Sequence, residues 1–250
     1  MLVSIITITY NSEEFLRETI RSVASQTYSK IEYIVVDGGS EDGTIEIIKD
    51  NSEVVTKYIS EKDDGIYDAL NKGMCMASGD LIGILHSDDF FVDEHVVGRY
   101  VNEFRNTDSE LIYSNLYYVD KTGDKTVRTW RSSNYVPKMF RWGWMPPHPT
   151  LYIKRSVMDA LGLYNSKFSS AGDYEYILRL MYFNRCRTSY LNIFSIKMRV
   201  GGESNRTLHN RLRGAKEDWR AWRVNGARPP FLLPLIKPLR KLGQFFGSES

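Results

Sequence analysis

Residues 31–44, Ile-Glu-Tyr-Ile-Val-Val-Asp-Gly-Gly-Ser-Glu-Asp-Gly-Thr, decide the fold of this 250-residue chain. The apolar run in Ile31–Asp37 is nearly continuous, which is typical of a strand buried on both faces of a sheet. The strand ends in an acidic residue and a glycine-rich turn, and Thr44–Lys49 then begins a short helix. A strand, a turn and a helix in this order predict one unit of a parallel sheet covered by helices.

The same order of strand and helix repeats on both sides of this stretch. Further strands are predicted at Leu2–Thr9, Val54–Ser60 and Leu81–Leu85. Helices are predicted at Ser12–Ser25, with Ser12 as N-cap, and at Ile66–Ala77 and Asp93–Arg105. We therefore predict an α/β fold with a single Rossmann-like, mostly parallel sheet flanked by helices.

After Leu111–Asn115 the pattern loosens. Asn134–Pro149 is a long aromatic loop, and loops of this length are usually functional or mobile. A short strand at Leu151–Ile153 and a helix at Tyr174–Phe183 are expected to follow it.

Ligands of open α/β sheets bind outside the carboxyl ends of the strands, and this rule selects the candidate residues. The predicted strands lead into Thr9–Ser12, Asp37–Thr44, Glu61–Gly65 and His86–Asp89. A dinucleotide-binding domain needs the pattern G-x-G-x-x-G after its first strand, so that backbone amides can approach the pyrophosphate. The turn Thr9–Ser12 contains no glycine, which argues against nicotinamide chemistry.

Without an amide cradle, the charge of a bound diphosphate needs another counterweight. Mg²⁺ or Mn²⁺ held by carboxylates would provide it, because these ions favour oxygen ligands and substrate phosphates. Ser87-Asp88-Asp89, at the end of the apolar strand Leu81–Leu85, is the best candidate. The alternative is that these acidic residues only cap a helix.

Taken together, these stretches resemble a family-two glycosyltransferase of the GT-A fold, of the bacterial polysaccharide-assembly type. The matching stretches follow the family's order and are residues 3–11, 34–44, 60–73, 87–89, 147–150 and 171–175. The resemblance implies a catalytic domain at 1–205, with a nucleotide-sugar-binding half at 1–115 and an acceptor-binding half at 116–205. A basic amphipathic, helical extension would follow at 206–250.

The resemblance also implies roles for individual residues. Contacts with the nucleotide-sugar would come from Thr9, Asn11, Asp37, Asp63 and Asp88, with Asp63 lining a uridine-type pocket and Asp88 facing the donor ribose or sugar. Asp89 would be the metal ligand, and Asp173 would be the general base.

Two positions depart from the family pattern. Gly172 stands where many members carry an acid immediately before the base, and His86 stands where an Asp or Asn is common. His86 could contact the donor or could simply pack at the strand end. His148 could contact the acceptor or the diphosphate, or could make a structural hydrogen bond.

The expected reaction is an inverting transfer from a nucleotide-sugar, preferably a UDP-sugar, to a glycan or lipid-linked acceptor in surface polysaccharide biosynthesis, with Mn²⁺ or Mg²⁺ as cofactor. An aspartate would take the proton of the acceptor hydroxyl while the metal stabilises the departing diphosphate. Two alternatives are a nucleotidyltransferase and an inactive subunit that only binds sugar nucleotides. A nucleotidyltransferase normally has a glycine-rich, basic first loop, which this sequence lacks. The presence of Asp89 and Asp173 argues against an inactive subunit.

The end of the chain is basic. Between Arg206 and Lys241, ten Lys and Arg residues accompany only two acids, whereas the preceding residues are net acidic. Aromatic and aliphatic residues interleave with these cations, so we expect peripheral contact of residues 206–246 with anionic lipid. The alternative is packing on the catalytic domain or on a partner subunit. The acidic remainder of the chain argues against nucleic acid as the partner.

Other features favour a cytoplasmic protein, with the tail placing it on the cytoplasmic face of the inner membrane. No basic region precedes the first strand, and no apolar stretch approaches the roughly 20 residues that cross a bilayer. Cys75 and Cys186 lack metal-ligand spacing and are expected to be reduced thiols in apolar surroundings. An oligomer is compatible with these patterns.

Overall fold

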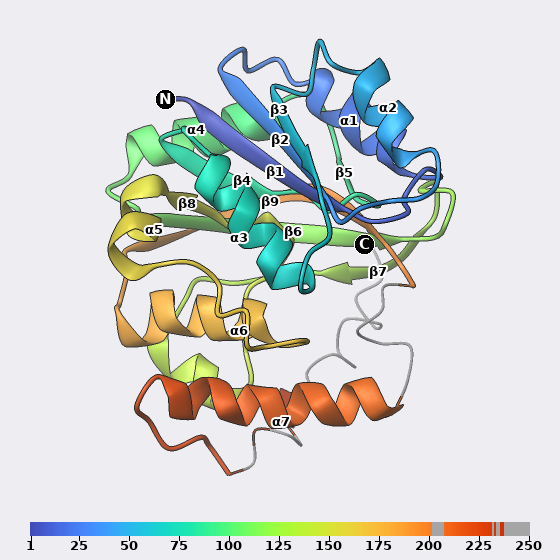
Figure 1. The fold of residues 1–250 in the computed structure, drawn as a ribbon. Coiled ribbons are helices and arrows are strands. Elements are labelled where there is room, and N and C mark those ends of the chain that lie inside the picture. The colour runs from blue at the N-terminus through green and yellow to red at the C-terminus, as the bar shows by residue number, and fades with distance from the viewer. Residues whose placement is uncertain (202–207, 232, 234–235, 238–250) are drawn as a thin grey trace.

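The computed structural model describes residues 1–201, 208–231, 233 and 236–237 (Figure 1). In this part of the chain, a nine-stranded sheet has the order β3-β2-β1-β4-β8-β6-β9-β5, with β7 paired to β6. The strands are β1 (Val3–Thr9), β2 (Ile31–Asp37), β3 (Lys57–Ser60), β4 (Leu81–Ile84), β5 (Phe90–Phe91), β6 (Leu111–Val119), β7 (Thr126–Trp130), β8 (Tyr152–Lys154) and β9 (Thr188–Arg199).

Helices cover both faces of this sheet. They are α1 (Leu16–Ala24), α2 (Thr44–Asp50), α3 (Ile66–Met76), α4 (Val96–Asn106), α5 (Arg155–Leu161), α6 (Gly172–Ile177) and α7 (Leu208–Val224). One core joins α1, α2 and α4 to one face, and the other joins α3, α5 and α6 to the opposite face. Neighbouring residues of β1 point into different cores, Ile5 into the first and Ile6 into the second. This is why β1 and β2 carry apolar residues on both faces.

The predicted α/β fold is confirmed, and its sheet is mixed. Strands β3, β2, β1 and β4 pair in parallel, as the repeated strand–helix pattern predicts. Beyond β4 the sheet continues with antiparallel β8, and β6 then pairs antiparallel with β8 and parallel with β9. The parallel strands bring their carboxyl ends to one edge, where the loops 9–12, 37–44 and 60–65 meet.

Several expected boundaries are corrected by the structure. Helix α1 begins at Leu16, and Ser12 does not cap it, since its hydroxyl bonds to the Tyr10 carbonyl and the Ser87 hydroxyl. The third strand begins only at Lys57. The long aromatic loop contains two short 3-10 helices, η1 (Pro137–Trp142) and η2 (His148–Thr150). Cys75 is exposed rather than in apolar surroundings.

The helix predicted at 174–183 begins earlier and changes its winding. Its first part is α6, and from Leu178 to Phe183 it continues as the π-helix η3. Figure 1 shows α7 lying alongside α6, on the side that faces away from the sheet. Ala221 and Trp222 of α7 are fully buried in this contact, so the inner face of α7 is part of the core.

The expected boundary at residue 205 lies outside the described residues, as do 206–207, 232, 234–235 and 238–250 of the expected extension. Among the described residues, the helices are all too short or too polar to span a membrane.

Candidate functional site

Three of the predicted nucleotide-binding residues lie at the carboxyl ends of β1 and β2. Thr9 is paired with Asp37 in the parallel register, and the Thr9 carbonyl accepts a hydrogen bond from the amide of Gly38 at 2.9 Å. Asn11 follows in the left-handed region at φ 47°, where its side-chain carbonyl accepts from the Glu41 amide at 2.9 Å. The loops after β1 and β2 are thus joined to each other.

The buried Asp37 carboxylate organises the glycine-rich turn that follows it. It accepts hydrogen bonds from the amides of Gly39 and Ser40, from the Ser40 hydroxyl, and from the Ser60 hydroxyl of β3 at 2.7 Å. The buried Thr9 hydroxyl behaves differently, because it has no hydrogen-bond partner in the described part of the chain. A buried polar group without a partner is costly, and a ligand hydroxyl or amide would satisfy it.

Asp63 lies over the same turn. A Cβ atom on Gly38 would come within 2.7 Å of the Asp63 carboxylate, so the absence of a side chain at Gly38 lets the two loops approach. The other Asp63 oxygen accepts from the Gly65 amide at 2.9 Å. The structure therefore brings Thr9, Asn11, Asp37 and Asp63 together at one edge of the sheet.

A second cluster forms from segments that are far apart in the chain. His86 follows β4, His148 begins η2, and Asp173 is the second residue of α6. The imidazole rings of His86 and His148 meet edge to face with centroids 5.7 Å apart. The Nδ1 atom of His148 lies 3.3 Å from a carboxylate oxygen of Asp173. His148 thus links the end of β4 to the proposed base.

Sequence reasoning missed Tyr67 as a neighbour of Asp173. The buried Tyr67 hydroxyl donates to Asp173 Oδ1 at 3.4 Å, and burial, followed by the charge of Asp173, raises the pKa of this phenol. The ring packs on Gly172, where an added Cβ would lie 2.8 Å from it. This contact explains the departure at Gly172, since a side chain there would displace Tyr67. The only feature of the sequence that pointed to Tyr67 was its place in residues 60–73, one of the stretches that resemble the family.

Asp88 and Asp89 have different surroundings. Asp88 is half-buried, and burial raises its pKa, with the Arg199 guanidinium acting in the opposite direction. Asp89 is fully buried, and neither carboxylate oxygen has a hydrogen-bond partner among the described residues. Burial, and then the charge of Asp88, raise the pKa of Asp89 well above its ordinary range. A carboxylate in this state needs a compensating charge.

Arg199 is the second residue that the sequence patterns do not reveal. It is 4% exposed at the end of β9, and its guanidinium donates to the Asp88 carbonyl at 2.6 Å and to the Glu18 carboxylate. Arg199 therefore fixes the backbone of the Asp88–Asp89 turn.

The surroundings of His86 decide its protonation. Burial among protein groups, and then the proximity of His148, lower the pKa of His86 to about 3. His86 is therefore neutral at physiological pH, and it can accept or donate a hydrogen bond but does not supply a positive charge for a diphosphate.

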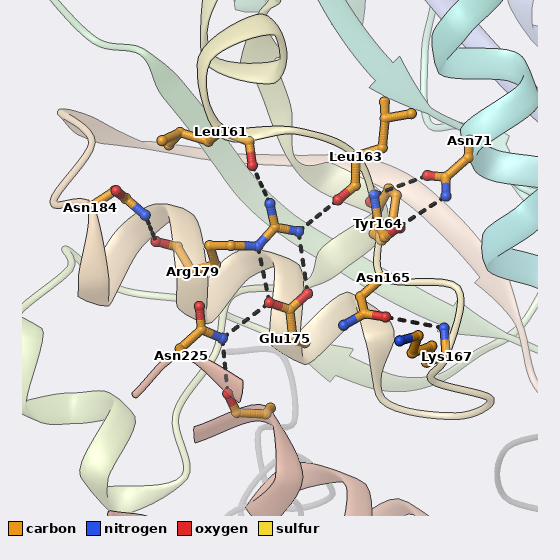
Figure 2. Close-up of polar contacts among 11 residues, drawn as sticks. Asn71, Leu161, Leu163, Tyr164, Asn165, Lys167, Glu175, Arg179, Asn184 and Asn225 are labelled. Carbon is orange, nitrogen blue, oxygen red and sulfur yellow. Dashed lines mark hydrogen bonds and ion pairs between the residues drawn. The ribbon is translucent and has the colours of Figure 1, made fainter. Parts of the chain in front are cut away.

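The other carboxylate of α6, Glu175, is occupied elsewhere. Figure 2 shows that its carboxylate accepts hydrogen bonds from the Arg179 guanidinium and from the side-chain amide of Asn225. The distance from Glu175 Oε1 is 3.0 Å both to Arg179 Nε and to Asn225 Nδ2. Arg179 also donates to the carbonyls of Leu161 and Leu163. Asp173 is thus the α6 carboxylate that faces the histidine cluster.

The residues present fit a divalent cation bound together with a substrate. Among the described residues, no group of three His, Cys, Asp or Glu side chains forms a complete metal site. The two orphaned oxygens of Asp89, beside the half-buried Asp88, are hard ligands of the kind that Mg²⁺ and Mn²⁺ prefer, and a donor diphosphate would complete the coordination.

Comparison of the sequence with known proteins finds a matching family model and related glycosyltransferases. Residues 4–164 match the family model described as Glycosyl transferase family 2. An uncharacterized glycosyltransferase of Mycobacterium tuberculosis H37Rv is 34% identical over 184 residues, which are 71% of this chain and 68% of the relative. A PGL/p-HBAD biosynthesis glycosyltransferase of Mycobacterium bovis BCG is 26% identical over 224 residues, covering 81% of this chain and 78% of that protein.

Solved structures share the fold at low sequence identity. The structure of Staphylococcus aureus TarS 1-349 in complex with UDP-GlcNAc is 18% identical with a TM-score of 0.69, over 90% of this chain and 65% of that one. This chain spans 39% of a longer TarS structure. The mannosyltransferase PcManGT of Pyrobaculum calidifontis, in complex with GDP-Man and Mn²⁺, is 18% identical with a TM-score of 0.62, over 96% of this chain and 69% of that one.

Proposed function

Because the chain belongs to glycosyl transferase family 2, we propose that it transfers a sugar with inversion, from a UDP-sugar to a glycan or lipid-linked acceptor of a surface polysaccharide. The observation that carries this proposal is the placement of Asp173 beside His148 and Tyr67, with His148 in turn against His86 after β4. The bound UDP-GlcNAc and GDP-Man of the two structural neighbours support a nucleotide-sugar donor.

Each side chain has a defined task in the proposed reaction. Asp173 accepts the proton of the acceptor hydroxyl as its oxygen attacks the anomeric carbon, and the bond from that carbon to the diphosphate breaks. His148 and Tyr67 hold the Asp173 carboxylate from two sides. Thr9, Asn11, Asp37 and Asp63 hold the nucleoside.

The Asp88–Asp89 turn would hold the cation, with Asp89 as the metal ligand and Asp88 toward the donor ribose or sugar. A bound Mn²⁺ or Mg²⁺ would neutralise the charge of the leaving diphosphate. The Mn²⁺ in the PcManGT complex supports this choice of cofactor. His86 and His148 would contact the diphosphate or the acceptor.

Turnover of nucleotide-sugars tests the proposed activity. We expect release of nucleoside diphosphate from one donor of a panel of UDP-, GDP- and TDP-sugars, dependent on Mn²⁺ or Mg²⁺, with an added glycan or lipid-linked acceptor increasing the rate. Chromatography of the nucleotide product measures this. Release of pyrophosphate would indicate a nucleotidyltransferase, and binding without turnover of any donor would indicate an inactive binding subunit.

The outer face of α7 supports peripheral attachment to anionic membranes, as part of the same proposal. Arg213, Lys216, Arg220 and Arg223 are all exposed on this helix, and Phe231 beyond it is 82% exposed. Cations near an anionic bilayer contribute about 1 kcal/mol each, and an exposed aromatic ring adds interfacial contact. The buried inner face of the same helix would hold the catalytic domain against the lipid surface. If the acceptor is lipid-linked, this attachment would bring the catalytic domain to the membrane that holds the acceptor.

We expect Lys216→Glu with Arg223→Glu to lower binding to vesicles containing anionic lipid by about 30-fold or more at low salt, because two attractive charges are lost and reversed. Vesicle flotation measures the bound fraction. Arg21→Glu with Lys49→Glu is the matched control, since it makes the same charge change at exposed positions of α1 and α2. Equal flotation of the unaltered protein, the α7 variant and the control variant would contradict the attachment. So would binding of the unaltered protein to neutral vesicles as strong as its binding to anionic vesicles.

A further inference from the structure

Helix α7 reaches the loop that leads into the helix of the proposed base. Helix α6 begins at Gly172, and Asp173 is its second residue. The Glu217 carboxylate of α7 accepts hydrogen bonds from the Ser169 amide at 3.0 Å, the Ser169 hydroxyl at 2.9 Å, the Ser170 amide at 2.7 Å and the Ala171 amide at 2.8 Å. Three consecutive backbone N–H groups thus converge on one side chain.

These bonds hold the backbone immediately before Asp173. The amide of Ala171 is bound by Glu217, while its carbonyl accepts from the Glu175 amide at 3.0 Å in the first turn of α6. Ala171 is itself buried, so it has little freedom to shift. Asp173 lies between Ala171 and Glu175, and its position therefore depends on both bonds.

Helix α7 makes a second contact on the other side of Asp173. The fully buried Trp222 donates from its indole nitrogen to the Tyr174 hydroxyl at 3.0 Å. Glu217 and Trp222 thus hold the residues that flank Gly172 and Asp173. The sequence separation between Glu217 and the loop is 46–48 residues, so the contact exists only in the folded chain.

Glu217 carries its negative charge at this place. It is 9% exposed, and burial alone would raise its pKa, but the hydrogen bonds from Ser169, Ala171 and Ser170 outweigh burial and hold the pKa below its ordinary value. A charged acceptor makes stronger hydrogen bonds to backbone amides than a neutral one.

We propose that Glu217 is a positioning residue for catalysis, which holds the 169–171 loop so that the Asp173 carboxylate stays at the reaction centre. This inference rests on the proposed role of Asp173 as base. Under this proposal, α7 contributes to catalysis by positioning Asp173. Small displacements of a reacting group reduce rates strongly, by up to about 100-fold for 1 Å.

Glu217→Gln tests the proposal, because the amide keeps the volume but places an NH₂ donor among the backbone N–H donors. We expect the kcat of transfer to fall by about 10- to 100-fold, with the KM for the donor unchanged, since the nucleotide-binding loops lie on other elements. The matched control is Asp218→Asn. Asp218 is the adjacent residue of α7, is similarly buried at 7%, and pairs with Lys237 rather than with the 169–171 loop.

The same change in an Asp173→Asn background separates positioning from general loss of stability. If Glu217 acts through Asp173, the second substitution adds almost nothing to the loss already caused by the first. Equal losses of kcat in Glu217→Gln and Asp218→Asn, or full additivity with Asp173→Asn, would overturn the proposal. Near-normal transfer by Asp173→Asn alone would instead overturn the proposed base.

Ser169→Ala is the milder variant if Glu217→Gln does not fold. It removes only the hydroxyl contact with Glu217 and leaves the three backbone bonds. We expect a reduction of kcat smaller than for Glu217→Gln, again without a change in the KM for the donor. A kcat equal to that of the unaltered protein would contradict the proposal in this case.

Discussion

Asp173→Asn is expected to reduce sugar transfer by about 10²- to 10⁴-fold, because an amide cannot accept the proton of the acceptor hydroxyl. Donor binding should be retained, since the loops after β1, β2 and β3 do not include this residue. The substitution is nearly isosteric, and the carbonyl oxygen of the introduced amide can still accept a hydrogen bond from Tyr67 and keep the fold of the site. Initial rates of transfer, together with the affinity for UDP and Mn²⁺ by calorimetry, measure both effects.

Asp159→Asn is the control for this substitution. Asp159 lies on α5 with a side chain that is 60% exposed, and its one described ion pair, to Arg155, is 3.8 Å long. We expect the Asp159→Asn variant to transfer sugar at the rate of the unaltered protein. Glu175 cannot readily replace Asp173, because Arg179 and Asn225 already occupy its oxygens (Figure 2). Transfer by Asp173→Asn within a few fold of normal would therefore require a base outside α6.

Asp89→Asn is expected to abolish the metal-dependent part of donor binding and also to stabilise the metal-free protein. The Asp89 side chain is buried without a hydrogen-bond partner among the described residues, and burial raises its pKa. Folding of the metal-free protein therefore has to bury an unpaired charge or take up a proton, and the neutral amide avoids this cost. In the unaltered protein, Mn²⁺ with UDP at 100 times their dissociation constant should add about 2.7 kcal/mol to the free energy of unfolding. The variant should lose this gain.

Thermal unfolding with and without Mn²⁺ and UDP distinguishes the two parts of this prediction. Asp88→Asn is the comparison, because Asp88 is the neighbouring carboxylate and is half-buried, whereas Asp89 is fully buried. If Asp89→Asn keeps the full stabilisation by Mn²⁺ and UDP while Asp88→Asn loses it, Asp88 is the metal ligand and the assignment of Asp89 is wrong.

The edge of the sheet that carries the proposed nucleotide site was predictable from local patterns. Continuous apolar runs at Val3–Thr9 and Ile31–Asp37 identify strands buried on both faces, and the helical spacing between them requires parallel pairing. The carboxyl ends of such strands share one edge, so Thr9, Asn11, Asp37 and Asp63 could be placed together without coordinates. The start of α1 and the start of β3 were harder, because capping and edge strands depend on neighbouring loops.

Tertiary structure alone decided how the surroundings of Asp173 and of the Asp88–Asp89 turn are assembled. Tyr67 and Asp173 are 106 positions apart, and their contact depends on Gly172 leaving room for a ring that arrives from α3. Arg199 reaches the Asp88 carbonyl across 111 positions, and Glu217 reaches the 169–171 loop from a helix whose sequence indicates only a basic, amphipathic segment. Periodicity reports which face of an element is buried, whereas the partner across that face is selected by packing between distant elements. The sequence by itself therefore determined the parallel part of the sheet and the edge that carries the proposed nucleotide site, and the packing of α3, α6 and α7 determined what surrounds Asp173.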